Sequence, residues 1–319
     1  MEPATVAALI GAARRHWAVD ETIEITLQAN PNSVEAARFA DLASAGVNRL
    51  SLGLQSFDDG ALALLGRAHS ASEGLSALDT AQRHFGRVSF DLIYAMPGDS
   101  EASWAATLDR ALSRGTSHLS LYQLTIEPGT RFASMVARHD FEPLDTDMSA
   151  NLFELTQETA VAAGLPAYEI SNHAAAGQES RHNLTYWRYG DYAGIGPGAH
   201  GRRLGMRTVR HRKPENFLSG LRRNGHGGVE EEPVTAREAA DEALVMGLRL
   251  AEGIDLSATE QRFGVPVVRP DAVDHLSNQG LLVQEGARLR TTAGGRLVLD
   301  SLLGAIAASS PSNSDRLRT

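Results

Sequence analysis

The chain has 319 residues, of which 42% are hydrophobic and 6% aromatic, and this is enough for one large domain, a smaller one and a sizeable core. Its formal net charge of −9 argues against generic nucleic-acid binding, which requires a basic face. The absence of cysteine excludes disulfides and thiolate-held clusters within the chain, and the absence of an apolar membrane-length stretch or a signal-peptide pattern makes the cytoplasm the expected compartment.

Strand-like and helix-like segments alternate through the first 171 residues. The patterns predict strands over 23–29, 48–55, 88–95, 118–125 and 167–171, and helices over 4–17, 34–45, 59–66, 72–85, 101–114 and 148–163. Strands that alternate with helices indicate a parallel sheet. Gly46 follows the second helix, at the position where helices commonly end in a left-handed residue.

Polar side chains recur near the ends of these predicted strands. They are Gln28, Gln55, Asp91, Gln123 and Thr125. In parallel α/β folds the functional site forms at the carboxyl ends of the strands. One polar strand end is often only solvated, but recurrence over four strands predicts a site at this edge.

From about residue 206 the sequence becomes basic and rich in turn residues, which predicts a loop and linker over 206–234. Thr235 and Glu238 form a capping box, and the helices and hairpin that follow over 235–307 are typical of a winged-helix domain. Ten acidic residues against seven arginines between 235 and 305 favour a structural or lid role over DNA binding. The polar segment 308–319 predicts a disordered tail.

The segment HNLTYW, residues 182–187, combines an imidazole with two large aromatic rings. An imidazole can coordinate haem iron, and flat rings can pack on a macrocycle. These six residues alone favour the more common interpretation, a structural histidine among core aromatics.

The glycine-rich run GIGPGAHG that follows permits close backbone approach, without the strand–helix context of a dinucleotide site. Within it, His200 is a second and weaker ligand candidate. The cations behind it suit a solvated loop better than partners of haem propionates; they are Arg202, Arg203, Arg207 and Arg210.

Five blocks of the sequence occur in a family-like order and spacing, within a resemblance that runs from about residue 5 to 305: ITLQANPNSVEAARFADLASAGVNRLSLGLQSF, LGRAH, FDLIYAMPGDS, LSLYQLTIEPGT and HNLTYWRYGDYAGIGPGAHG. Together they resemble HemW-type haem chaperones, a branch of the radical S-adenosylmethionine (SAM) superfamily related to oxygen-independent coproporphyrinogen III oxidase. The resemblance implies an α/β fold with a partial, TIM-barrel-like (β/α) barrel over 1–205 and a winged-helix-like C-terminal domain over 235–307.

The resemblance also implies which residues bind SAM at the strand ends. They are Gln28, Gln55, Arg67, Asp91 and Thr125. Amide, guanidinium and carboxylate groups suit the aminoacyl, ribose and adenine parts of SAM. The family has glutamate where Gln28 stands, so the amide keeps the shape of that contact and loses its charge.

Family members hold a 4Fe–4S cluster through a CxxxCxxC motif, which precedes a strand ending in GGGTP. Neither motif occurs here, so the barrel is expected to lack its first two βα units. Either Met1 is an internal methionine of a longer product or the chain is a shortened form. The first is favoured, because loss of two strands would leave the segment 23–28 with an unpaired edge. Without thiolates, neither radical chemistry nor coproporphyrinogen oxidase activity is expected.

The resemblance assigns His182 as the axial haem ligand, with Asn183 orienting it and Tyr186 and Trp187 facing the macrocycle. The implied function is to bind haem and deliver it to haem-requiring proteins such as respiratory enzymes. Two alternatives stay open: a coproporphyrinogen III oxidase of porphyrin biosynthesis, and a non-catalytic fragment without cofactor. No nucleic-acid partner is expected, while peripheral membrane association and a homodimer are left open.

Overall fold

The computed structural model describes residues 1–308, apart from the side chains at 33 and 34. The chain divides into two compact units, Met1–Glu179 and Ser180–Thr319. The predicted barrel boundary at 205 therefore differs from the boundary between these units. All but the first residue of the predicted tail, 308–319, lies outside the described residues.

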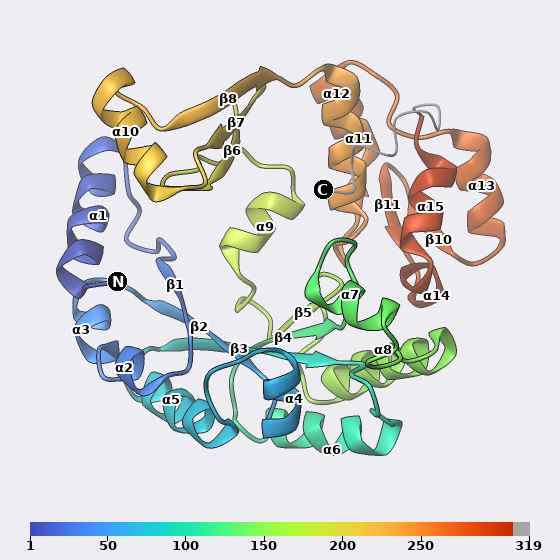
Figure 1. The fold of residues 1–319 in the computed structure, drawn as a ribbon. Helices are drawn as coiled ribbons and strands as arrows, with labels where there is room; N and C mark the ends of the chain where they lie inside the picture. Colours follow the sequence, from blue (N-terminus) through green and yellow to red (C-terminus); the bar gives the residue numbers. More distant parts are fainter. Residues whose placement is uncertain (309–319) are drawn as a thin grey trace. The chain divides into compact units, whose positions relative to one another are not determined.

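A five-stranded sheet in the order β1-β2-β3-β4-β5 organises the first unit (Figure 1). The strands are β1 (Thr26–Ala29), β2 (Arg49–Gln55), β3 (Arg87–Tyr94), β4 (His118–Gln123) and β5 (Asn172–Ala174). The first four are parallel, as predicted, and β5 is antiparallel to β4.

The fifth strand differs from its prediction over 167–171. The amide of Tyr168 bonds the carbonyl of Asn172 at 3.0 Å, so this segment turns back on itself and the next three residues form the strand. Asn172 then pairs with Ser120 of β4, whose hydroxyl donates to its side-chain oxygen at 2.6 Å.

The helices of the first unit largely match the predicted positions. They are α1 (Pro3–His16), α2 (Ser33–Ala36), α3 (Phe39–Ser44), α4 (Asp59–Leu64), α5 (Ala71–His84), α6 (Glu101–Leu112), α7 (Arg131–Ala137) and α8 (Thr146–Ala162). The helix predicted over 34–45 is interrupted at 37–38, and α7 was not predicted. Gly46 has a φ of +110°, as expected for a residue that ends a helix.

The core of this unit lies between the sheet and the helices α5, α6 and α8, which cover one face of it in Figure 1. Side chains alternate between the two faces of a strand, so Leu50, Leu52 and Leu54 all point into this core and are completely buried. The positions between them carry Arg49, Ser51, Gly53 and Gln55. The opposite face of β2 therefore carries no large apolar side chain.

The second unit begins with α9 (Arg181–Trp187) and a three-stranded antiparallel sheet. Its strands are β6 (His200–Arg203), β7 (Met206–Arg210) and β8 (Gly228–Pro233), and α10 (Pro214–Asn224) connects the last two. The prediction of a loop and linker over 206–234 is wrong in this respect. The strands lack the apolar alternation that indicates a strand, because β7 reads Met-Arg-Thr-Val-Arg and β8 reads Gly-Val-Glu-Glu-Glu-Pro.

The remaining elements form the winged-helix-like domain. They are α11 (Ala236–Gly247), β9 (Ile254–Asp255), α12 (Leu256–Phe263), α13 (Pro270–Asn278), β10 (Leu282–Glu285), β11 (Arg288–Thr291), α14 (Ala293–Leu297) and α15 (Leu299–Ile306). The hairpin β10–β11 pairs with β9 to form a small antiparallel sheet. The Thr235–Glu238 capping box is confirmed, and the closing helix predicted over 293–307 is divided at Val298.

Candidate functional site

Three of the five predicted SAM-binding residues come together at β2 and β3. Nε of Arg67, in the segment after α4, donates to the side-chain oxygen of Gln55. The backbone amide of Gln55 donates to Oδ1 of Asp91 at 3.3 Å. An amide, a guanidinium and a carboxylate therefore lie together where β2 ends.

A backbone irregularity in β2 places Gln55. The register with β3 shifts between Leu52 and Gln55, and Gln55 has a φ of +65°. A bulge re-aims the side chains that follow it, and a left-handed non-glycine residue stores strain that is common at functional sites. The strand end thus places the side-chain oxygen of Gln55 against Arg67 and its backbone amide against Asp91.

Asp91 lies partly buried on the polar face of β3. Burial raises the pKa of its carboxyl to about 6, and the effect is opposed by the hydrogen bond from the Gln55 amide and by the charge of Arg67. A carboxyl with a pKa close to neutrality, among converging polar groups, is a common feature of functional sites.

The other two predicted SAM contacts are more peripheral. Gln28 is exposed on β1 across from Ser51. Thr125 is exposed after β4, and its hydroxyl donates to the carbonyl of Gln123 at 3.3 Å. The structure thus brings together Gln55, Arg67 and Asp91 and leaves these two side chains at the surface.

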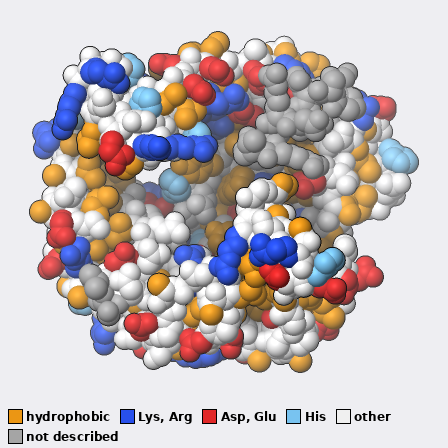
Figure 2. All heavy atoms as spheres, viewed as in Figure 1, with side chains coloured by type: hydrophobic (Ala, Val, Ile, Leu, Met, Phe, Trp, Pro, Cys, Tyr) orange, Lys and Arg blue, Asp and Glu red, His pale blue; other side chains and the backbone are white. Residues whose placement is uncertain are grey.

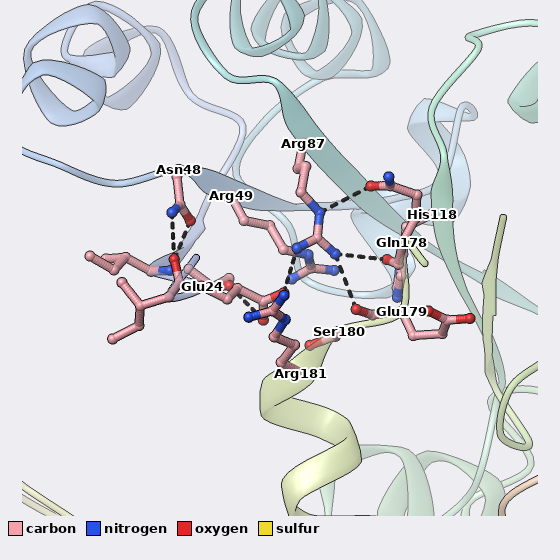
Figure 3. Close-up of polar contacts among 12 residues, drawn as sticks. Glu24, Asn48, Arg49, Arg87, His118, Gln178, Glu179, Ser180 and Arg181 are labelled. Carbon is pink, nitrogen blue, oxygen red and sulfur yellow. Dashed lines mark hydrogen bonds and ion pairs between the residues drawn. The ribbon is translucent and has the colours of Figure 1, made fainter. Parts of the chain in front are cut away.

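The strand starts carry a separate polar layer, drawn in Figure 3. The guanidinium of Arg87 donates to Glu24 at 2.8 Å and to the carbonyls of Gln178 and Glu179 at 2.9 and 3.0 Å. Arg49, opposite Arg87 in register, donates to Ser89 at 3.1 Å, and burial lowers the pKa of its guanidinium. These bonds fasten strands to each other and to the end of the unit, which indicates a structural role.

Helix α9 carries the HNLTYW motif, and Ser180 caps it by accepting from the backbone amide of Asn183 at 3.3 Å. His182 is exposed, and Tyr186 lies one turn later on the same face. Their rings meet edge to face with centroids 4.6 Å apart. The ring of Tyr192 contacts Tyr186 in the same manner at 4.4 Å.

Trp187 has a different environment from His182. Five residues along an α-helix correspond to about 140° of rotation, so the indole points to another side of α9. The guanidinium of Arg249 lies 4.7 Å from its ring centroid. Trp187 also lines a cavity of about 250 Å³, bordered by α11 and α12, that includes Arg262 and Phe263.

The predicted propionate partners Arg202 and Arg207 are engaged within the second unit. Arg202 is only 5% exposed; its guanidinium stacks 3.4 Å above the ring of Tyr189 and lies 3.5 Å from Glu242. Arg207 forms an ion pair with the same carboxylate. Arg203 and His200 are exposed, and Nε of Arg210 donates to the carbonyl of Gly194 at 3.2 Å.

The glycine-rich run after α9 closes on its own backbone. A Cβ at Gly194 would overlap the carbonyl oxygen of His200, and a Cβ at Gly201 would lie 2.8 Å from the amide nitrogen of Gly194. This close approach explains why the sequence is rich in glycine here. The glycine-rich run thus packs against the backbone of β6, and this close packing accounts for its glycines at 194 and 201.

Across residues 1–308, no group of three or more His, Asp or Glu is arranged to hold a metal ion. Over the same range, no helix is long and apolar enough to cross a membrane. Positive and negative side chains are interspersed on the face displayed in Figure 2, and the chain carries a net charge of −9.

Comparison with known proteins identifies the family. A sequence profile of the Radical SAM superfamily matches residues 3–111, and one of the HemN C-terminal domain matches residues 234–298. The Escherichia coli protein named "Heme chaperone HemW" is 37% identical over 305 residues, covering 92% of this chain and 78% of that protein. The chain belongs to the HemW-type family of the radical SAM superfamily.

Other relatives agree with this assignment. The Bacillus subtilis heme chaperone HemW is 31% identical, covering 88% of this chain and 75% of that protein. The mouse "Radical S-adenosyl methionine domain-containing protein 1, mitochondrial" is 39% identical, covering 94% of this chain and 71% of that protein. The solved structure of E. coli coproporphyrinogen III oxidase (HemN) superimposes with a TM-score of 0.77 at 19% identity, covering 95% and 74%, which confirms the predicted α/β fold of radical SAM type.

Membership of the HemW-type family raises the question of which family cofactors these residues fit. With no cysteine, the chain supplies no thiolate for a 4Fe–4S cluster. The carboxylate, amide and guanidinium around Asp91 suit a ligand with hydroxyl and carboxylate groups such as SAM. The exposed imidazole of His182 suits an axial contact with haem iron.

Sequence reasoning missed several residues that organise this region. Tyr189 and Glu242 had no motif to indicate them, because their contact joins positions 53 residues apart. Tyr192 lies five residues after the HNLTYW motif, and its aromatic character was the one available signal.

Proposed function

We propose that this chain binds haem and passes it to haem-requiring proteins, such as respiratory enzymes, with the His182 imidazole as axial ligand. One observation carries the proposal. In a family whose bacterial relatives are named heme chaperones, an exposed His182 is held edge-on against Tyr186 on α9. Haem would be cargo here, so the site needs to hold and release it rather than activate it.

The arrangement around His182 suits reversible binding. An exposed ring on a short helix gives haem access from solvent, and the adjacent Tyr186 offers apolar surface for the macrocycle. Asn183 stands next to His182 in the sequence and could orient the imidazole through the ring nitrogen that iron does not occupy. Trp187 lies on another side of α9, so any contact that it makes with the macrocycle would be through the cavity that it lines.

A haemin titration followed by Soret absorbance tests the proposal. The wild-type chain should give a saturable shift and the His182→Ala variant a much weaker one. His200→Ala also removes an exposed histidine of the same unit, and it should match wild type if His182 is the ligand. A wild-type chain without a saturable shift, or a His182→Ala variant that titrates like wild type, would overturn the proposal.

We also propose that Gln55, Arg67 and Asp91 bind SAM. When it is bound beside a reduced cluster, SAM supplies radical chemistry; this chain's own residues would hold its polar groups. Loss of one charge-assisted hydrogen bond costs about 1.5–3 kcal/mol, so Asp91→Asn should weaken SAM binding roughly 10- to 100-fold. Calorimetric titration checks this, with Asp109→Asn, which neutralises an exposed carboxylate on α6, as the matched variant expected to leave the affinity unchanged.

The compartment and assembly remain part of the proposal. We place the chain in the cytoplasm, as the sequence predicts, while the mouse and cow relatives are named mitochondrial. Fractionation of cells that express the chain tests the compartment, and the soluble and membrane fractions test peripheral membrane association. Light scattering of the purified chain tests the homodimer.

A further inference from the structure

Three aromatic rings of the second unit form a continuous row that ends at His182. The imidazole meets Tyr186 at 4.6 Å with an interplanar angle of 80°, and Tyr186 meets Tyr192 at 4.4 Å with an angle of 70°. Both contacts are edge to face, which is a preferred geometry for aromatic pairs. Tyr186 is therefore held between the other two rings.

Tyr192 is the anchored end of this row. Its amide donates to the carbonyl of Arg202 at 2.7 Å, and the amide of Arg202 donates back at 3.0 Å. These two bonds form an isolated antiparallel bridge. Tyr192 is thus fixed by its backbone to strand β6, outside the helix that carries His182.

Arg202 makes this anchor rigid. Its buried guanidinium stacks on Tyr189, donates to the carbonyl of Gly190 at 3.1 Å and lies near Glu242 of α11. The guanidinium also lies 5.6 Å from the ring centroid of Tyr192. A side chain held by an ion pair, a carbonyl and two aromatic rings cannot readily change its position, so the bridge to Tyr192 is fixed as well.

Binding an iron fixes the imidazole of His182 in one ring orientation, which has an entropic cost. A fixed neighbour reduces that ordering cost. We propose that Tyr192 is a positioning residue for His182, acting through Tyr186 to hold the imidazole in one orientation. The inference rests on the proposed haem binding, because the orientation matters for function only if His182 is a ligand.

The contacts suggest a pair of matched substitutions. Both aromatic contacts are made by rings, so Tyr192→Phe keeps the row intact. Tyr192→Leu keeps apolar bulk and the backbone bridge to Arg202 but removes the ring that holds Tyr186. A difference between these two variants therefore reports on the ring itself.

The first measurement is made on the haem-free full chain by NMR. The ring resonances of His182, assigned by their loss in His182→Ala, sense the orientation of Tyr186 through its ring current. At one fixed pH, Tyr192→Leu should shift these resonances, and Tyr192→Phe should leave them near their wild-type positions. Unchanged resonances in Tyr192→Leu, with an unchanged melting temperature, would overturn the inference.

The second measurement is a haemin titration of the same variants. The loss of one edge-to-face contact should weaken haemin binding about 2- to 10-fold in Tyr192→Leu, with wild-type affinity in Tyr192→Phe. Shifted resonances with equal affinity would overturn the functional part of the inference. If wild type binds no haemin but Tyr192→Leu still shifts the His182 resonances, the proposed function fails and the positioning by Tyr192 stands.

Discussion

The phenol of Tyr189 donates a hydrogen bond of 2.7 Å to a carboxylate oxygen of Glu242. This contact joins the segment after α9 to α11, the first helix of the region that matches the HemN C-terminal domain. Burial, and then the carboxylate of Glu242, raises the pKa of the Tyr189 phenol, so the phenol stays protonated and remains the donor. The same carboxylate also pairs with the buried Arg202.

Removal of this carboxylate should strongly destabilise the second unit. Glu242→Ala would leave Arg202 as a buried cation without its partner, which typically costs about 3–5 kcal/mol. The matched variant is Glu252→Ala, which breaks the ion pair between Glu252 and Arg188. Their side chains are 43% and 54% exposed, respectively, so this loss should cost less than about 1 kcal/mol. Chemical denaturation compares the two variants. Equal losses in free energy of unfolding would contradict the role of Glu242 as the partner of a buried cation.

The glycine at 194 should be intolerant of a side chain. A methyl group there would overlap the carbonyl oxygen of His200, so the backbone must shift, and forced overpacking typically costs about 1–3 kcal/mol. A methyl group at Gly304 on α15 would instead point into open space, and Gly304→Ala should stabilise its helix by up to about 1 kcal/mol. Thermal melts of both variants check the opposite signs.

The sheet of the first unit could be predicted because its signal is local. In β2, Leu50, Leu52 and Leu54 alternate with polar residues, and this period is that of a strand with one face in the core. The polar strand ends likewise follow from chain order, since parallel strands bring their carboxyl ends to one edge. Gln55 and Asp91 were identified in this way, and Arg67 came from the family resemblance.

The sheet of the second unit could not be predicted in the same way. Its strands β7 and β8 carry arginines and glutamates in place of alternating apolar residues, and a charged segment shows no strand pattern until its partner strand is known. The burial of Arg202 depends on Glu242, 40 residues along the chain. The cation appears as an ordinary surface residue until the fold supplies that carboxylate.

The hydrogen bond between Trp104 and Thr156 should be important for the first unit. The indole nitrogen donates to the hydroxyl of Thr156 at 2.7 Å in the core, where Trp104 also stacks on Tyr94 at 4.9 Å. Thr156→Val keeps the shape but leaves a buried donor without its acceptor, which costs about 1–3 kcal/mol. Thr107→Val on α6, where the hydroxyl of a half-buried threonine donates to the carbonyl of Ser103 within its own helix, should change stability by less than about 0.5 kcal/mol. Urea denaturation distinguishes them, and a neutral Thr156→Val would contradict the role of this bond.

Asp91 should make the stability of the first unit depend on pH in an unusual direction. Its pKa is raised from 3.8 to about 6 in the folded chain, so the folded state binds the proton more tightly than the unfolded state does. The penalty for burying its charge is therefore absent below pH 3.8, grows as the pH rises from 3.8 to about 6, and is complete above that value. A shift of this size corresponds to at most about 3 kcal/mol.

The Asp91→Asn variant isolates this effect, because an amide has a similar shape, can accept from the Gln55 amide and carries no charge. Relative to wild type, the variant should gain free energy of unfolding between pH 4 and pH 7, with most of the change between pH 4 and pH 6. Urea denaturation at a series of pH values measures the difference. The difference in free energy of unfolding between wild type and variant could instead stay constant over this range or change in favour of wild type as the pH rises. Either result would show that the pKa of the Asp91 carboxyl is not raised. The proposed SAM site would then hold an ordinary surface carboxylate.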